Sequence, residues 1–87
     1  MQLVEILLKR GANVNNGGSG SITPLMWACK RDNPYLTSFL IENGADMTLK
    51  SNEGYTALDY AIVHGNYRPA LFVFEFYSIT LEYFDYY

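Results

Sequence analysis

Residues 54–61 read Gly-Tyr-Thr-Ala-Leu-Asp-Tyr-Ala, and a related pattern lies 33 residues earlier in the chain. Thr23 matches Thr56 at this offset, and Ala28 matches Ala61. A Leu follows each of the two threonines by two positions. A fixed spacing that several independent positions share indicates an internal repeat, and this is the strongest signal in the sequence.

A second motif, Gly-Ala followed by Asn or Asp, repeats with the same spacing. It begins at Gly11 in the first copy and at Gly44 in the second, which again differ by 33 positions. A pair of aliphatic residues precedes each copy, at positions 7–8 and 40–41. We therefore expect equal-length units that stack, so that each unit buries its apolar edge against the next.

The matched positions fit a unit that begins with a short helix. Thr23 and Thr56 are good N-cap residues, because a Thr hydroxyl can accept a hydrogen bond from an unpaired N–H group in the first turn. Pro24 follows at the first helical position, where its missing N–H group costs nothing. We expect the first helix of one unit over residues 23–31 and its copy over residues 56–64.

A second helix is expected after each first helix. Leu36 and residues 39–41 give it an apolar face. Gly44 ends it, because the left-handed conformation that commonly follows a helix favours glycine. The segment between Gly44 and Thr56 is rich in polar turn residues and is expected to form a hairpin-like finger.

From about Leu3 to Asn66 the chain resembles the ankyrin-repeat family, which has a 33-residue period and a Thr-Pro-Leu-His-x-Ala signature. The resemblance implies an all-α solenoid of stacked helix–turn–helix units with hairpin-like finger loops. The signature His is Met26 in one copy and Asp59 in the other. Because this His joins hydrogen bonds that hold the fingers in the family, its replacement predicts looser fingers. Residues 16–21 are expected to be a flexible linker.

The period divides the chain into unequal parts. It predicts a partial N-terminal repeat in residues 1–17, a complete repeat in 18–50, an incomplete C-terminal repeat in 51–77, and an aromatic, acidic tail in 78–87. The partial N-terminal repeat holds a second helix and its turn, with an apolar edge at Leu3, Ile6 and Leu7. Repeat stacks need about three units and polar end caps. We interpret the chain as a fragment, a diverged gene product or one end of a longer array.

The C-terminal region carries two competing patterns. A second helix is expected from about Arg68 to Tyr77, but no Gly-Ala pair follows it. Apolar residues are spaced as in a helix at positions 72, 76, 79 and 83, and they alternate as in a strand at 72, 74 and 76. The favoured interpretation is a helix to about Leu81 with a frayed end. The tail is interpreted as a hydrophobic cap over the last repeat, with a docking surface or an aggregation-prone end as alternatives.

Composition argues against several classes of function. The chain has 87 residues and a formal net charge of −3, which argues against nucleic acid as a partner. Cys29 is the single cysteine, so an internal disulfide is impossible, and nothing resembles a signal peptide; a reducing, intracellular and cytoplasmic setting is expected. The longest apolar run, residues 69–81, contains Glu75 and is too short to span a membrane. No membrane partner is therefore predicted.

Few residues are candidates for chemistry. Cys29 and His64 are the only thiol and the only imidazole, but they are offset by 35 positions rather than 33, and burial is the favoured interpretation of Cys29. Asp59 is interpreted as a hydrogen-bonding residue at the start of its helix rather than a general base. Asn15 fits a turn, although its position resembles the acceptor of an asparaginyl hydroxylase in the family. No catalytic residue, cofactor or metal site is predicted.

In the ankyrin family, partners lie across a concave side formed by the fingers and the first helices. The predicted function is therefore non-catalytic binding of a protein partner, as an adaptor or scaffold. Tyr55 is the expected anchor, because Tyr is enriched among residues that dominate binding energy. Trp27 and Tyr60 hold equivalent places in the two first helices, where either packing or partner contact is consistent with the sequence. The predicted binding residues are Ser19, Gly20, Ile22, Lys30, Arg31, Lys50, Asn52, Glu53, Tyr55, Val63 and His64.

Other hypotheses stay open beside this one. The chain could be a regulatory or targeting ankyrin segment of a larger protein, such as a ubiquitin-ligase adaptor or an enzyme encoded upstream. Catalysis by the chain itself would need a polar pocket that converges on Cys29 or His64. Self-association through the exposed repeat ends or the aromatic tail is a further candidate interaction.

Overall fold

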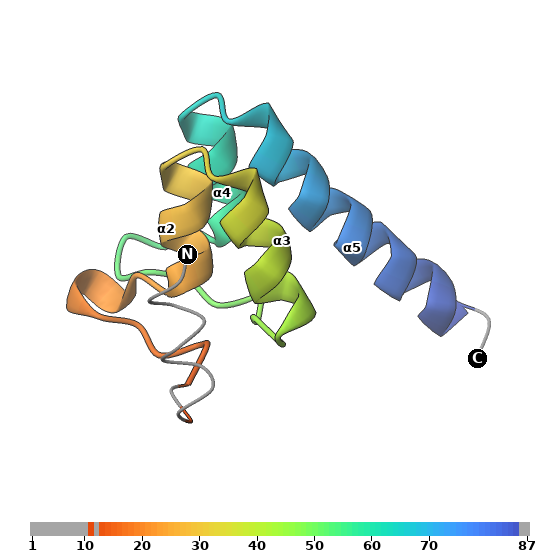
Figure 1. Ribbon diagram of the computed structural model, residues 1–87, viewed down its shortest axis with the longest axis horizontal. Coiled ribbons are helices and arrows are strands. Elements are labelled where there is room, and N and C mark those ends of the chain that lie inside the picture. Colours follow the sequence, from red (N-terminus) through yellow and green to blue (C-terminus); the bar gives the residue numbers. More distant parts are fainter. Residues whose placement is uncertain (1–10, 12, 86–87) are drawn as a thin grey trace.

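The computed structural model describes residue 11 and residues 13–85, with side chains described as far as Phe76. The elements are a short 3-10 helix η1 (Ser19–Ser21) and the helices α2 (Pro24–Lys30), α3 (Pro34–Glu42), α4 (Ala57–Val63) and α5 (Tyr67–Asp85). No strand occurs in this part of the chain. α2 packs beside α4, and α3 and α5 lie on one side of this pair (Figure 1). The expectation of an all-α fold is therefore confirmed.

Side-chain caps fix the starts of α2 and α4 at the two threonines that the repeat aligns. The Thr23 hydroxyl accepts a hydrogen bond from the Met26 N–H at 3.3 Å, and the Thr56 hydroxyl accepts from the Asp59 N–H at 3.2 Å. The Asp59 Oδ2 in turn accepts a hydrogen bond from the Thr56 N–H at 2.9 Å, which completes a capping box. Both predicted first helices are thus confirmed, as is the interpretation of Asp59 as a capping residue.

Turn residues set both ends of α3. The Asn33 side chain accepts from the Leu36 N–H at 3.0 Å, and Pro34 occupies the first helical position. After the helix, Gly44 adopts a φ of +89°, in the left-handed region that favours glycine. The second helix predicted for this unit, and its end at Gly44, are confirmed.

α5 differs from the expectation at its C-terminal end. It is one helix of 19 residues and continues past the predicted end near Leu81. The alternating residues at positions 72, 74 and 76 therefore belong to a helix and not to a strand. Pro69 is the only strong helix breaker within α5, and it lies in the first turn, where proline is tolerated. The predicted repeat boundary after residue 77 lies within this helix, and the division into repeats stays a prediction.

The core lies where the two units meet. Ala28 and Ala61, which the repeat aligns, are both fully buried, so α2 and α4 can approach closely. Leu40 of α3 and Val73 of α5, another matched pair, are also buried in this core. The buried apolar residues are Leu25, Met26, Ala28, Cys29, Leu40, Ile41, Ala45, Ala57, Tyr60, Ala61 and Val73.

The finger loops repeat with the same period as the helices. The Gly18 N–H donates to the Ile22 carbonyl at 3.2 Å, which closes the first finger. The Ser51 N–H donates to the Tyr55 carbonyl at 2.9 Å, which closes the second finger 33 residues later. Each finger is therefore a hairpin-like turn, although neither contains a strand.

The two fingers are also bonded to each other. The Asn52 N–H donates to the Gly20 carbonyl at 2.8 Å. Residues 16–21 differ from the flexible linker that we expected, because they contain η1 and are tied to the neighbouring finger by this bond. A main-chain bond thus connects the two fingers, although the signature His is replaced in both copies.

The turn that ends the first partial repeat contacts the matching turn of the next unit. The Asn15 side-chain amide donates to the Gly44 carbonyl at 3.3 Å, and its Oδ1 accepts from the Asp46 N–H at 2.6 Å. Val14 packs against the core. The interpretation of Asn15 as a turn residue is therefore confirmed, and its resemblance to a hydroxylase acceptor stays an untested alternative. The predicted apolar edge at Leu3, Ile6 and Leu7 lies outside the described residues.

Candidate protein-binding surface

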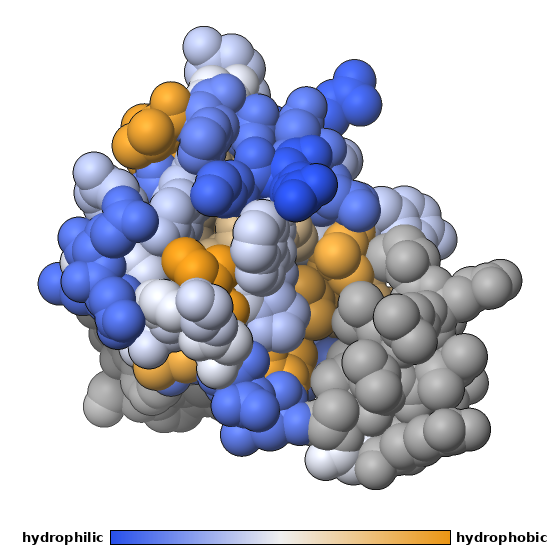
Figure 2. All heavy atoms as spheres, turned by 90° about the vertical axis from the view of Figure 1, so that its left-hand side faces the viewer, coloured by the Kyte–Doolittle hydropathy of each residue, from blue (hydrophilic) through white to orange (hydrophobic). Residues whose placement is uncertain are grey.

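The predicted binding residues form two groups on the side of the molecule that carries the fingers, α2 and α4. The fingers supply Ser19, Gly20, Ile22, Lys50, Asn52, Glu53 and Tyr55, and the C-terminal ends of α2 and α4 supply Lys30, Arg31, Val63 and His64. All of them are exposed except Ile22, which is half-buried. Because α2 and α4 lie side by side, the two helix ends are neighbours. Figure 2 shows this side of the molecule, where blue hydrophilic residues surround smaller orange apolar patches.

Tyr55 is an exposed aromatic residue on a rigid support. Its ring meets the buried Tyr60 ring edge to face, with 5.4 Å between the ring centroids and an angle of 82° between the planes. The Tyr60 hydroxyl donates to the Ser51 Oγ at 2.9 Å, which fixes Tyr60 against the second finger. The Tyr55 ring is therefore held in place before any partner arrives, so little side-chain entropy would be lost on binding.

Trp27 is a second exposed aromatic residue, and the sequence did not decide its role. The Lys30 Nζ lies 5.2 Å from the Trp27 ring centroid, and the Arg31 Cζ lies 5.0 Å from it, so both cations interact with the ring. This cation–ring interaction could be predicted from the sequence, because Lys30 and Arg31 follow Trp27 by three and four residues and so share its helix face. The repeat does not predict that Trp27 is exposed, since the matched Tyr60 is buried.

Cys29 and His64 lie in different environments. Cys29 is fully buried in the core, whereas His64 is exposed at the end of α4. Burial raises the pKa of the Cys29 thiol to about 11, although a hydrogen bond with Thr37 acts in the opposite direction. A neutral, buried thiol is a poor nucleophile, so the interpretation of Cys29 as a core residue is confirmed. Within the described residues, no group of three or more His, Cys, Asp or Glu side chains could hold a metal ion.

The stability of the protein is expected to fall at alkaline pH because of Cys29. The folded-state pKa of about 11 lies above the ordinary value of 9.0, so the folded protein holds this proton more tightly than the unfolded chain. The resulting stabilisation is complete below pH 9.0 and is lost as the pH rises to about 11. A rise in the thiol pKa from 9.0 to about 11 corresponds to about 3 kcal/mol of stabilisation.

Urea unfolding at a series of pH values measures this loss, and a Cys29→Ala chain is the control. The control lacks the thiol but keeps every tyrosine and lysine, so it retains all the other alkaline titrations. Its free energy of unfolding should decline less than that of the original chain over the same pH range. Equal declines in the two proteins would show that the thiol is not buried.

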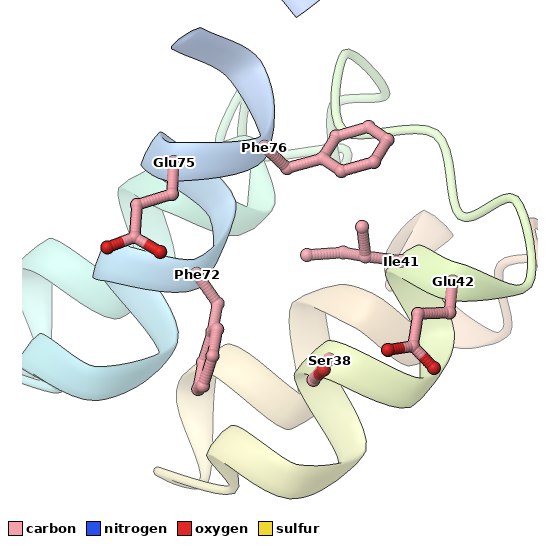
Figure 3. Close-up of a pocket in the computed structure, with 6 residues that line it drawn as sticks. All are labelled: Ser38, Ile41, Glu42, Phe72, Glu75 and Phe76. Atoms are coloured by element: carbon pink, nitrogen blue, oxygen red, sulfur yellow. The ribbon is translucent and has the colours of Figure 1, made fainter. Parts of the chain in front are cut away.

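A separate pocket of about 200 Å³ lies between α3 and α5, outside the predicted surface. Figure 3 shows Phe72 and Phe76 extending from α5 to the α3 side of the pocket, with Ile41 of α3 between them. The carboxylates of Glu42 and Glu75 lie on opposite sides of the pocket, so they do not converge on one point. The pocket is an apolar groove with an acidic rim. Neither Cys29 nor His64 lines it, so it is not the polar pocket that catalysis by these residues would need.

The stacked helix pairs, the capped first helices and the bonded fingers define a protein built from repeats. A family model described as "Ankyrin repeats (3 copies)" matches residues 1–81. The chain therefore belongs to the ankyrin-repeat family, as the resemblance implied. Ankyrin repeats are generally protein-interaction modules. No helix in the described part of the chain combines the length and the apolar character that crossing a membrane requires.

Three relatives illustrate the proteins that this chain resembles. It is 30% identical over 77 residues to palmitoyltransferase AKR1 of Lachancea kluyveri, covering 87% of this chain and 10% of that protein. It is 34% identical over 76 residues to the ankyrin repeat and KH domain-containing protein mask-1 of Caenorhabditis elegans, covering 86% of this chain and 3% of that protein. The ankyrin repeat and LEM domain-containing protein 1 homolog of Caenorhabditis elegans is 43% identical over 60 residues, covering 69% of this chain and 8% of that protein. The chain thus spans a tenth or less of the length of these curated relatives.

Proposed function

We propose that this chain is a non-catalytic binding module of the adaptor or scaffold type, which holds a protein partner across its concave ankyrin surface. The observation that carries the proposal is the exposed Tyr55 ring, held by Tyr60 and by the bonded second finger. Binding energy concentrates in such rigid, exposed aromatic residues, because ordering them costs little. A cytoplasmic location is part of the proposal.

The charges on this surface indicate the chemistry of the partner. Lys30, Arg31 and Lys50 are exposed there, with Glu53 as the single acidic residue among the proposed binding residues. The surface is therefore basic, although the chain as a whole carries a net charge of −3. Complementary charges speed association and exclude wrong partners. The proposed partner is a protein segment that presents carboxylates beside an apolar or aromatic group.

Affinity capture with the immobilised chain, read by mass spectrometry, tests this proposal. The baits are the original chain, a Lys30→Glu chain and an Arg68→Glu chain, and both substitutions lower the net charge by two units. Arg68 is exposed at the start of α5, outside the proposed surface, so Arg68→Glu controls for net charge alone. We expect proteins that the original and Arg68→Glu baits retain and that the Lys30→Glu bait recovers about fivefold less at low salt, as losing about 1 kcal/mol implies.

Two results would contradict the proposal. Equal loss of the captured proteins with both charge reversals would show that net charge, rather than the concave surface, governs binding. Retention with all three baits would place the contact elsewhere on the molecule.

A second candidate function rests on the lengths of the relatives. They are at least ten times longer than the matched region, and one of those named above is a palmitoyltransferase. The alternative is therefore a regulatory or targeting ankyrin segment within a larger protein, for example an enzyme or a ubiquitin-ligase adaptor. Sequencing the transcript upstream of the Met1 codon tests it, because an in-frame stop directly before that codon would eliminate an upstream enzyme.

A further inference from the structure

The sequence contains two Asn-Gly steps, Asn16–Gly17 and Asn43–Gly44. An asparagine followed by glycine is prone to rearrange, because glycine has no Cβ that would keep its main-chain nitrogen away from the asparagine side chain. The reaction needs a glycine N–H that can lose its proton and an asparagine side chain that is free to turn towards the glycine nitrogen. A hydrogen bond at either group opposes the reaction, and the two steps differ in this respect.

Asn43–Gly44 is held in place at the end of α3. The Asn43 side-chain amide donates a hydrogen bond to the Phe39 carbonyl at 2.8 Å, which turns it back along the helix. The Gly44 N–H donates to the Ile41 carbonyl at 3.1 Å, and this bond stabilises the protonated nitrogen. Because both bonds must break before the step can react, we expect it to react slowly in the folded protein.

Asn16–Gly17 is exposed at the base of the first finger. Residues 16–18 have no regular secondary structure and lead into η1 (Figure 1). The Asn16 main-chain N–H donates to the Asn13 carbonyl at 3.1 Å, but this nitrogen takes no part in the reaction. Among the residues that the structure describes, neither the Asn16 side chain nor the Gly17 N–H has a hydrogen-bond partner. Both requirements are therefore met in the folded state.

We propose that Asn16 is a site of spontaneous isoaspartate formation, and that the product loosens the first finger. The Gly17 nitrogen forms a bond to the Asn16 Cγ, and the bond from Cγ to the side-chain nitrogen breaks. That nitrogen leaves as ammonia, with the proton that the Gly17 nitrogen gave up. A water molecule then opens the succinimide ring, either at the main-chain carbonyl carbon of residue 16, which gives isoaspartate, or at Cγ, which gives aspartate. The reaction needs no oxidant or reductant.

Isoaspartate changes the finger in two ways. It adds a carboxylate, and it routes the main chain through the former side chain, which inserts an extra carbon before Gly17. Gly17 already lies tightly against the turn that follows, because a Cβ built on it would lie 2.9 Å from the main-chain carbonyl carbon of Ser21. We therefore expect the added carbon to disturb the bond from the Ser21 N–H to the Gly18 carbonyl, which is 3.0 Å long. This inference rests on the fold and does not depend on the proposed function.

Peptide mapping of the purified full chain tests the site. Trypsin places the two steps in separate peptides, residues 11–30 and 32–50, and electron-transfer fragmentation distinguishes isoaspartate from aspartate. In the folded chain, kept in mildly alkaline buffer, Asn16 should be converted roughly tenfold or more faster than Asn43, because hydrogen bonds protect only Asn43. In urea, which removes those bonds, the two sites should react at similar rates.

Two outcomes would overturn the site. Equal conversion of Asn16 and Asn43 in the folded chain would show that the hydrogen bonds of α3 do not separate the two steps. Conversion of Asn16 in urea but not in the folded chain would show that the native finger holds this side chain away from the Gly17 nitrogen.

Amide hydrogen exchange tests the effect on the finger, with a freshly purified Asn16→Asp chain as the matched control. This variant carries the added charge without the added carbon. The Ser21 N–H should exchange roughly fivefold or more faster in the isoaspartate form than in the original chain, and the variant should exchange like the original chain. Unchanged exchange at Ser21 in the isoaspartate form, or equal acceleration in the variant, would overturn the proposed loosening by the longer main chain.

Discussion

The Leu40→Ala variant is expected to lose about 3 kcal/mol of its free energy of unfolding, within the range of roughly 2 to 5 kcal/mol for such changes. Leu40 is fully buried in α3, where it joins the core shared by the two units. Shortening it removes apolar contacts and leaves a cavity. A chain of 87 residues has a total stability of only about 4 to 13 kcal/mol, so this single change removes a large share of it.

Urea unfolding followed by circular dichroism measures the loss, with Leu71→Ala as the control. Leu71 undergoes the same chemical change in α5, but its side chain is exposed, so the expected effect is within about 0.5 kcal/mol. The Leu40 and Leu71 variants should therefore differ by more than about 2 kcal/mol. Similar losses in the two variants would mean that Leu40 is not in a packed core.

The Tyr55→Ala variant is expected to weaken binding of the captured partner by about 30-fold or more, equivalent to roughly 2 kcal/mol. The Tyr55 ring is exposed and rests on Tyr60, so its removal takes away partner contact while Tyr60 and its bond to Ser51 remain. Helical circular dichroism should stay unchanged. Titration calorimetry with the partner identified by affinity capture measures the dissociation constant.

Tyr35→Ala is the matched control for this prediction. Tyr35 is also an exposed tyrosine, but it lies in α3 and outside the proposed surface. Its removal should leave the dissociation constant unchanged. Equal weakening by both variants would exclude Tyr55 as the anchor, and loss of helical signal in the Tyr55 variant would show that Tyr55 has a structural role.

The sequence predicted the parts of the fold that local chemistry decides. Thr23 and Thr56 cap α2 and α4 because a Thr hydroxyl needs only the N–H three residues ahead. Gly44 ends α3 because few other residues tolerate its φ of +89°. The capping role of Asp59 was predictable for the same reason. The 33-residue period then placed the two units beside each other.

Features that depend on more distant neighbours were harder to predict. Trp27 and Tyr60 occupy matched positions, yet one is exposed and the other buried, because burial depends on which helix lies alongside. The first finger was expected to be flexible because the signature His is replaced and the segment resembles a linker. The bond that ties it to the second finger joins the Asn52 N–H to the Gly20 carbonyl, and main-chain bonds of this kind cannot be predicted from side chains. The full length of α5 also escaped prediction, since both a helical and a strand-like spacing run through it.

The residues of the candidate surface stay a prediction, and the contacts that support them could not be predicted from the sequence. The family resemblance gave the positions of Tyr55, Lys30 and Arg31, and the structure exposes all three. The contact of Lys30 and Arg31 with the Trp27 ring could have been predicted from their helical spacing, but it was overlooked. The Ser51–Tyr60 bond that steadies Tyr55 joins residues nine positions apart in a loop and a helix, so no local pattern predicts it.

The fold depends on two units related by 33 residues that lie side by side, with α2 against α4. Nuclear Overhauser spectroscopy tests it most directly at Asn66, whose side-chain amide bridges the units. We expect cross-peaks between the Asn66 amide protons and the α protons of Cys29 and Lys30. Cross-peaks from this amide to residues of its own unit alone, with none to the end of α2, would contradict it.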